Sequence, residues 1–366
     1  AVPQSLAYAQ LAGVPPIFGL YAAFIPTIVG ALLGSSQLLS TGPVAMTSLL
    51  TAASVAPLVG AGSDKFIDYV VMLSLLSGLF QLMFGVLRMG VLLNFLSHPV
   101  LMGFVNAAAI IIALSQLPML LGIPAHQSNH FLLDIGQMLT HIDETELLTL
   151  GFGAVSLLML IVFKRKLPSW PGVLITVALL TAVSRIIGFE QLGGRVVGTV
   201  PAGLPGVSVP PLDWHMMVHL LPASFVIALI SFMEAMSSAK IIAIRTRTPW
   251  DENRELIGQG IAKMAAAFCH SMPVSGSFSR SALNLAAGAR TRLSSLVSAA
   301  FVLATLLYLT PLLYHLPKAV LAAIIMVAKT GFWMLMRVNH MARRPTSSPA
   351  RPRRPSPPRP RAASRG

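Results

Sequence analysis

Residues 273–280 read PVSGSFSR and residues 40–44 read STGPV, and each stretch opens an apolar segment that is short for a membrane span. The two segments are Gly42–Pro57 and Gly276–Gly288. Serine, threonine and glycine before an apolar run, with proline at its first positions, are typical of helix starts. At about 1.5 Å per residue, neither helix comfortably crosses a hydrocarbon layer of about 30 Å. The pattern predicts two half-helices that begin inside the membrane.

The composition of the chain predicts an integral membrane protein. Of its 366 residues, 55% are hydrophobic and 10% are charged, whereas soluble domains carry about 25% charged residues. A water-soluble enzyme is therefore excluded. Apolar runs separated by glycine, proline and charge predict twelve helical segments. Their approximate ranges are 3–13, 16–33, 43–57, 67–87, 99–121, 147–163, 172–187, 217–239, 253–271, 276–288, 293–313 and 317–336.

The order of these segments indicates two related halves. Each short segment is third in its set when the chain is divided at about residue 210 into two units of seven. Such interrupted segments at matching positions indicate an inverted-repeat transporter with its site at the middle of the bilayer. The alternative is a pair of ordinary short or re-entrant helices. If the segments alternate in direction, ten basic residues fall in one group of loops and four in the other, so the first group is expected on the cytoplasmic side.

The two helix starts are expected to form an anion site. Each offers unpaired N–H groups and about half a positive charge, and Arg280 in the first turns of the second short segment adds one charge. Glu234 lies deep in the segment 217–239, and a carboxylate inside a membrane is a functional hypothesis by default. The site carries about +2, or about +1 when Glu234 is ionised, so a dianion is matched only when Glu234 is protonated. This favours co-transport of a proton and a divalent anion.

Both charges have alternative interpretations. Glu234 could be a neutral carboxyl bonded to a neighbouring helix, or it could pair with Lys240 towards the cytoplasmic side. Arg280 could pair with a lipid phosphate if its segment began nearer one surface.

Polar and aromatic residues near the expected helix starts are further candidates. Gln4 and Tyr8 lie one helical turn apart and can face the same cavity. Ser277, Phe278 and Ser279 head the second short segment. The alternative is structural, because serine commonly bonds to its own helix and aromatic residues in spans commonly pack.

No cofactor, metal or nucleic-acid partner is expected. The single cysteine, Cys269, excludes disulfide frameworks and paired-thiolate sites. The chain contains neither an HExxH motif nor a P-loop, and its nine histidines share no helical spacing suited to a metal. The net charge of +14 includes eight arginines within residues 343–366, where no acid accompanies them.

Three longer motifs resemble the SulP/SLC26 sulfate permease family. The motifs are VPQSLAYA (2–9) with LAGVPP (11–16) and GLY (19–21), PVSGSFSRS (273–281) with GARTR (288–292), and LPKAVLAAI (316–324). They resemble the family's opening signature, its tenth helix and its twelfth helix, in that order. The resemblance covers about residues 1–328. It implies an all-α membrane protein with a 7+7 inverted-repeat, UraA/SLC26-like fold, in which a core moves against a gate domain.

The resemblance also implies a site built from helix starts. The candidate substrate-binding residues are Gln4, Tyr8, Gly42, Pro43, Val44, Ser277, Phe278, Ser279 and Arg280. Glu234 falls on the eighth helix, where transporting relatives keep an acid or a cation site, and it is the candidate residue for the coupling ion. Substrates of the family include sulfate, bicarbonate, chloride, oxalate and dicarboxylates.

The first functional hypothesis is a secondary active anion transporter that takes up sulfate with protons by alternating access. The alternatives are sodium-coupled bicarbonate or dicarboxylate transport, an uncoupled anion channel, and a non-transporting membrane scaffold. An enzyme is not expected, because no activated nucleophile or metal constellation is visible. The resemblance further implies a multi-pass protein of the bacterial inner membrane, in contact with lipid and homodimeric.

The expected domain organisation is one transmembrane domain at residues 1–328, with repeats at about 1–210 and 211–328. Relatives usually continue with two more helices and a cytoplasmic STAS domain, whereas residues 329–342 form a short apolar and basic segment. Residues 343–366 are mainly arginine, proline, serine and alanine, which predicts a disordered tail. We interpret this tail as a frameshifted or truncated end, with the last two helices missing.

Overall fold

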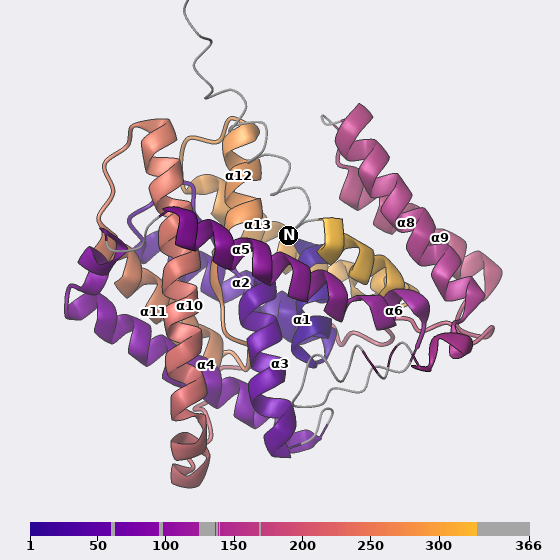
Figure 1. Cartoon of the computed structure of the whole chain (residues 1–366), viewed down its shortest axis with the longest axis horizontal. Helices are drawn as coiled ribbons and strands as arrows, with labels where there is room; N and C mark the ends of the chain where they lie inside the picture. Colours follow the sequence, from indigo (N-terminus) through magenta and orange to yellow (C-terminus); the bar gives the residue numbers. More distant parts are fainter. Residues whose placement is uncertain are drawn as a thin grey trace, which may run out of the picture.

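Helices dominate the computed structural model, which describes residues 1–59, 63–94, 98–123, 136, 138, 140–167 and 170–327 (Figure 1). The first half contains α1 (Val2–Ala12), α2 (Pro16–Leu33), β1 (Ser40–Gly42), α3 (Ala45–Val59), α4 (Asp64–Val86), η1 (Met89–Asn94), α5 (His98–Ser115), α6 (Leu117–Leu121), η2 (Ile142–Glu144), α8 (Leu147–Lys166) and α9 (Gly172–Ile187). The second half contains α10 (Trp214–Thr246), α11 (Glu252–Phe268), β2 (Ser275–Ser277), α12 (Phe278–Ala286), α13 (Leu293–Ala304), η3 (Thr305–Leu309), η4 (Thr310–Leu313) and a helix at Lys318–Val327.

Five of the described helices are long and apolar enough to cross a membrane. They are Pro16–Leu33, Lys65–Val86, Leu147–Lys166, Trp214–Thr246 and Leu293–Leu313. Between and after them lie shorter apolar helices, which include α3 and α9. The prediction of many apolar helical segments is therefore confirmed over the described residues.

Several segment boundaries differ from those expected, each for a local reason. The segment 99–121 is divided into α5 and α6, because Pro118 in the first turn of α6 has no N–H to continue the helix of α5. The segment 217–239 is too short, since α10 begins at Trp214, where the side chain of Asp213 accepts a hydrogen bond from the N–H of His215 at 2.9 Å. Asp213 thus caps the helix earlier than hydropathy indicates.

The later segments also differ. The segment 293–313 starts as α13, changes to a π-helical turn in η3 and ends as a 3-10 turn in η4, which contains Pro311. The last segment was expected at 317–336, and its helix is described from Lys318 to Val327. The expected segment 329–342 and the tail 343–366 lie outside the described residues.

The helices around the two short segments pack on one another. Helix α11 lies against α4 and α2, α10 packs on α4 and β2, and α1 packs on α2 and α3. Helices α4 and α11 approach each other closely, since a Cβ atom on Gly260 would lie 2.6 Å from the backbone nitrogen of Leu82. Helices α8 and α9 instead pack against each other at one edge of the molecule (Figure 1).

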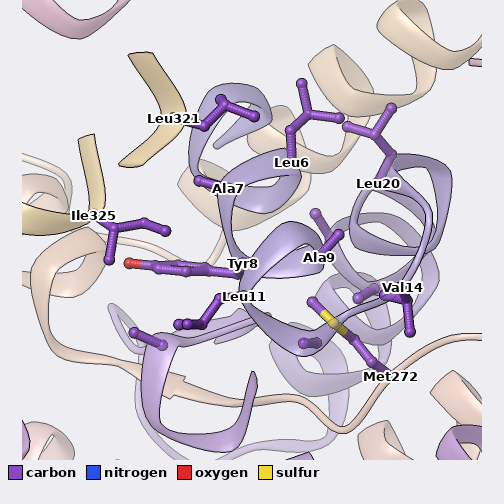
Figure 2. Close-up of a cluster of buried hydrophobic side chains, with 14 of the residues drawn as sticks. Leu6, Ala7, Tyr8, Ala9, Leu11, Val14, Leu20, Met272, Leu321 and Ile325 are labelled. Carbon is purple, nitrogen blue, oxygen red and sulfur yellow. The ribbon is translucent and has the colours of Figure 1, made fainter. Parts of the chain in front are cut away.

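Helix α1 passes through the main hydrophobic core. Figure 2 shows Leu20 and Val14 on one side of this helix, while Tyr8 projects on the other side towards Ile325. All four side chains are buried. The core therefore fixes the direction in which Tyr8 points.

The connection between α9 and α10 ties the two halves together. The backbone N–H of Lys318 donates to the carbonyl of Arg195 at 2.9 Å. The hydroxyl of Tyr314 donates to Glu190 Oε1 at 3.2 Å, and this hydrogen bond, together with the negative charge of Glu190, raises the pKa of Tyr314. The start of the last described helix is thus held by the end of the first half.

Candidate anion site

The strands that precede the two short helices pair with each other. Strand β1 runs antiparallel to β2, with Ser40 opposite Ser277 and Gly42 opposite Ser275. Helix α12 begins directly after β2, and α3 begins at Ala45, three residues beyond the end of β1. Because the strands are antiparallel, the two helices leave the sheet in opposite directions with both N-termini towards it. The expectation that the two helix starts meet is confirmed.

Hydrogen bonds from neighbouring helices hold β1 in place. The N–H of Ser40 donates to Ser281 Oγ of α12 at 2.9 Å. The carbonyl of Thr41 accepts from Thr27 Oγ1 of α2 at 2.8 Å, and Thr41 Oγ1 accepts from Gln259 Nε2 of α11 at 2.7 Å. We call the paired strands β1 and β2, with the helix starts that follow them, the crossing. The crossing is therefore anchored to α2, α11 and α12 together.

Small residues allow the crossing to sit tightly against α10. A Cβ atom on Gly276 would lie 2.9 Å from Cβ of Ala235 in α10, which leaves no room for a side chain. Ser275 Oγ donates to the carbonyl of Ser231 at 3.3 Å. Since Glu234 directly precedes Ala235, this contact brings the carboxylate-bearing turn of α10 next to β2.

Arg280 lies in the first turn of α12 and is 8% exposed. Its backbone N–H is capped by Ser277 Oγ at 3.4 Å. Its side chain reaches to β1, where a Cβ atom on Gly42 would lie 2.8 Å from Nη2. Among the described residues, neither Nε nor Nη2 has a hydrogen-bond partner. Burying such donors without a partner is costly, so the guanidinium is suited to receive an anion.

Gly42 meets two requirements at this contact. Its φ of 153° is a conformation that residues with a side chain rarely adopt. It also leaves open the space that the guanidinium of Arg280 fills. The next two candidate residues, Pro43 and Val44, are buried where the chain enters α3.

Tyr8 brings α1 to the same place. Its side chain is buried, and its hydroxyl interacts with the side chain of Ser279. The charges of Arg280 and Glu234 both act on it. Residues from α1, α10 and α12 are therefore brought together.

The remaining candidates lie beside this group. Gln4 is half-buried, one turn before Tyr8 on α1. Ser277 Oγ lies 3.4 Å from Ser279 Oγ, and Phe278 is half-buried between them in the sequence. The structural alternative for Ser277 holds in part, since its hydroxyl caps α12 and thereby orients the turn that carries Arg280.

Two charged residues that the sequence interpretation missed are completely or almost completely buried. Lys263 of α11 is 0% exposed, and the charge of Glu234 acts on it. Glu255, two turns earlier on α11, accepts hydrogen bonds from the N–H groups of Ser35 and Ser36, each at 2.7 Å. Lys263 could have been found, because it is the only charged residue between Glu255 and the end of α11, and charges inside spans are functional candidates.

No metal centre is visible at this site. Among the described residues, no group of three or more histidine, cysteine, aspartate and glutamate side chains could hold a metal ion. The groups that converge are a cation, helix N-termini, hydroxyls and one carboxylate, which suits an anion better than a metal.

Two antiparallel half-helices inside a multi-pass helical bundle define an inverted-repeat membrane protein of the kind found among transporters. The chain belongs to the sulfate permease family, whose sequence profile matches residues 1–347. It is an integral membrane protein.

Individual relatives agree with this assignment. The probable sulfate transporter 4.2 of Arabidopsis thaliana is 36% identical over 338 residues, which cover 90% of this chain and 50% of that protein. The chain thus spans about half the length of this relative. The structure of SLC26A9 matches with a TM-score of 0.84 at 23% identity, over 94% of this chain and 57% of that one. The transmembrane domain of the bicarbonate transporter BicA from a cyanobacterium matches with a TM-score of 0.80 at 25% identity, over 92% of this chain and 87% of that one. The inverted-repeat fold is therefore confirmed.

Proposed function

We propose that this chain carries sulfate across the membrane by secondary active transport, with proton coupling at Glu234. The observation that carries the proposal is Arg280, whose buried Nε and Nη2 donors have no hydrogen-bond partner among the described residues. They lie where the starts of α3 and α12 converge. The family relatives named as sulfate transporters support this choice of anion.

Charge balance favours a divalent anion. The two helix N-termini contribute about half a positive charge each and Arg280 one full charge, which gives about +2. This matches the charge of sulfate when the negative charge of Glu234 is neutralised. A proton that neutralises Glu234 would then travel with the anion, and the membrane would be crossed by a site without net charge.

Alternating access is supported by how the helices pack. The elements that hold the site, α1, β1, α10, β2 and α12, are joined directly or through α2, α3 and α11. Helices α8 and α9 pack on each other at the edge (Figure 1). The elements that hold the site would form one body, and α8 and α9 would belong to the other. These two bodies can move relative to one another and expose the site to either side of the membrane in turn.

Sodium-coupled bicarbonate transport is the second candidate. It is favoured by the match to BicA, which is a bicarbonate transporter. In this case a sodium ion, rather than a proton, would neutralise Glu234. A dicarboxylate would satisfy the same charge balance as sulfate, whereas an uncoupled channel or a scaffold would need no coupling group at all.

Uptake of labelled sulfate into proteoliposomes that contain the full chain tests the proposal. An inward proton gradient is expected to accelerate uptake by the natural sequence. Glu234→Gln is expected to abolish this acceleration. The matched control is Glu144→Gln, because Glu144 is an exposed acid outside the site, and it is expected to keep the response.

Other outcomes decide between the candidates. Uptake that ignores both the gradient and the Glu234 substitution would refute proton coupling. Stimulation by a sodium gradient, with competition by bicarbonate, would establish the second candidate instead. Uptake proportional to concentration without saturation would indicate a channel, and no uptake of any anion would leave a scaffold.

The cellular setting follows from the same proposal. We propose a bacterial inner membrane and a homodimer, on the basis of the motifs shared with the family. Exposed apolar side chains on α8 and α9, such as Leu158 and Leu174, fit a surface that faces lipid or a second copy. Cross-linking in native membranes, followed by mass measurement, tests the dimer.

A further inference from the structure

Lys263 is a buried cation for which the mechanism above has no role. It lies on α11 with 0% exposure, and its Nζ has no hydrogen-bond partner within the part of the chain that the structure describes. A buried ammonium without a partner is strongly disfavoured unless an opposite charge compensates it. Its presence therefore needs an explanation.

The base of the Lys263 side chain is fixed by close helix packing. A Cβ atom on Gly78 of α4 would lie 2.9 Å from Cβ of Lys263, and Ser74 Oγ of α4 donates to the carbonyl of Lys263 at 3.0 Å. The lysine therefore starts from the seam between α4 and α11. It cannot move away without separating these two helices.

The charged groups around Lys263 come from few elements. Helix α10 contributes Glu234, whose charge acts on Lys263 and also on Tyr8 and Arg280. Helix α4 contributes uncharged polar groups along this stretch, Ser74 and Gln81. On α11 itself the nearest acid is Glu255, which is already engaged by the backbone of Ser35 and Ser36. Helix α2 has no charged residue. Glu234 is therefore the carboxylate available to balance Lys263.

We propose that Lys263 and Glu234 act as one unit that holds a single exchangeable proton, and that Lys263 thereby sets which anion charge the site accepts. This inference rests on the proposed function and specifies its coupling step. With one proton the unit consists of an ammonium and a carboxylate, or of their neutral forms, and its net charge is zero. Without that proton it consists of a neutral amine and a carboxylate, and its net charge is −1.

The charge of the whole site then follows. Arg280 and the two helix N-termini give about +2, so the protonated unit leaves about +2 for sulfate and the deprotonated unit leaves about +1. A dianion favours the protonated unit, and its release favours loss of the proton. One proton moves with each sulfate, although the carboxyl of Glu234 is not required to be the protonated group. Two ionisable groups that interact strongly titrate as a pair.

Charge rescue tests the pair. Lys263→Asn leaves Glu234 alone, so the site matches sulfate only after Glu234 itself is protonated. We expect the pH of half-maximal sulfate uptake to shift by at least one unit towards acid. In the double variant Lys263→Asn with Glu234→Gln, these two positions carry no charge at any pH. It should regain sulfate exchange to within about tenfold of the natural sequence and should lose the response to a proton gradient.

The control is Lys65→Asn, which removes an exposed lysine at the start of α4 and should leave the pH profile unchanged. An unchanged pH profile in Lys263→Asn would overturn the proposal. So would a double variant that is as inactive as Lys263→Asn at every pH, because loss without rescue indicates a purely structural lysine.

Binding measured apart from transport separates the two proposals. The rise in unfolding temperature caused by sulfate is recorded against pH for the same variants in detergent. If the natural chain takes up no sulfate, the proposed function fails. The proposed pair is then still supported if, in Lys263→Asn, the sulfate-induced rise in unfolding temperature requires a lower pH than in the natural chain. The proposed pair is refuted if this pH dependence is unchanged.

Discussion

Replacing Arg280 by alanine is the most direct perturbation of the candidate site. The substitution removes two buried donors, Nε and Nη2, that have no hydrogen-bond partner among the described residues. Hydrogen bonds between charged groups contribute about 1.5–3 kcal/mol each. If both donors bind sulfate, the loss is about 3–6 kcal/mol, which corresponds to roughly a hundredfold to ten-thousandfold weaker binding.

A monovalent anion should be affected less. In a point-charge picture, the attraction to a guanidinium about 4 Å away is about 4 kcal/mol per unit of anion charge at an effective dielectric constant near 20. The dianion therefore loses about twice as much as chloride or nitrate. We expect Arg280→Ala to weaken sulfate by at least tenfold more than it weakens either monovalent anion.

Competition against labelled sulfate and labelled chloride uptake in proteoliposomes measures both effects. Arg185→Ala is the matched control, because Arg185 is exposed on α9 and lies outside the site. Arg280→Lys separates charge from geometry, since lysine keeps the charge but not the planar set of donors, and it should recover part of the loss. Equal weakening of sulfate and chloride in Arg280→Ala would refute the charge argument.

Further substitutions test the frame around the site. Gly42→Ala combines an unfavourable φ of 153° with a Cβ atom 2.8 Å from Arg280 Nη2, so sulfate uptake should fall by more than tenfold; Gly206→Ala, where a Cβ atom meets nothing within 4 Å, is the control, and equal effects would contradict the crowding. Tyr8→Phe removes the hydroxyl that interacts with Ser279 and should weaken sulfate binding by about two- to tenfold, as expected for the loss of one hydrogen-bonding group, about 0.5–1.5 kcal/mol; unchanged sulfate affinity would show that the hydroxyl does not support the site. Glu255→Gln weakens the acceptor for two buried N–H groups and should lower the free energy of unfolding by about 1–3 kcal/mol, measured by denaturation in detergent, and unchanged stability would contradict this role.

The half-helices were predictable from the sequence because their starts are marked by residue type. Proline, glycine and serine at Gly42–Pro43 and at Ser275–Ser277 are local features, and local features determine where a helix can begin. The same holds for Glu234 and Arg280, since each is the only charged residue in its predicted helical segment. These features depend on only a few residues that are adjacent in the sequence, so a single sequence is sufficient to predict them.

The anchoring of the crossing was not predictable in the same way. Gln259 and Thr41 are bonded across 218 residues, and Glu255 and Ser35 across 220. In a helix that is apolar on most sides, hydrophobic periodicity does not reveal which face meets a neighbour. Lys263 could have been noted as a lone charge in its stretch, but its place at the seam with α4, within the influence of Glu234, could not be predicted, because a helical position alone does not determine which face meets a neighbour.

The packing of α4 on α11 therefore influences the charge of the anion site. Gly78 and Gly260 let the two helices approach until a Cβ atom on Gly260 would overlap the backbone of Leu82 at 2.6 Å. This approach fixes the base of Lys263 at the seam and keeps its ammonium within the influence of Glu234. A larger residue at Gly260 would separate the helices and move the lysine, although it would touch neither Arg280 nor the helix starts. Substrate charge preference should consequently respond to substitutions at this seam, because the site's charge depends on where a helix lies as well as on which groups it carries.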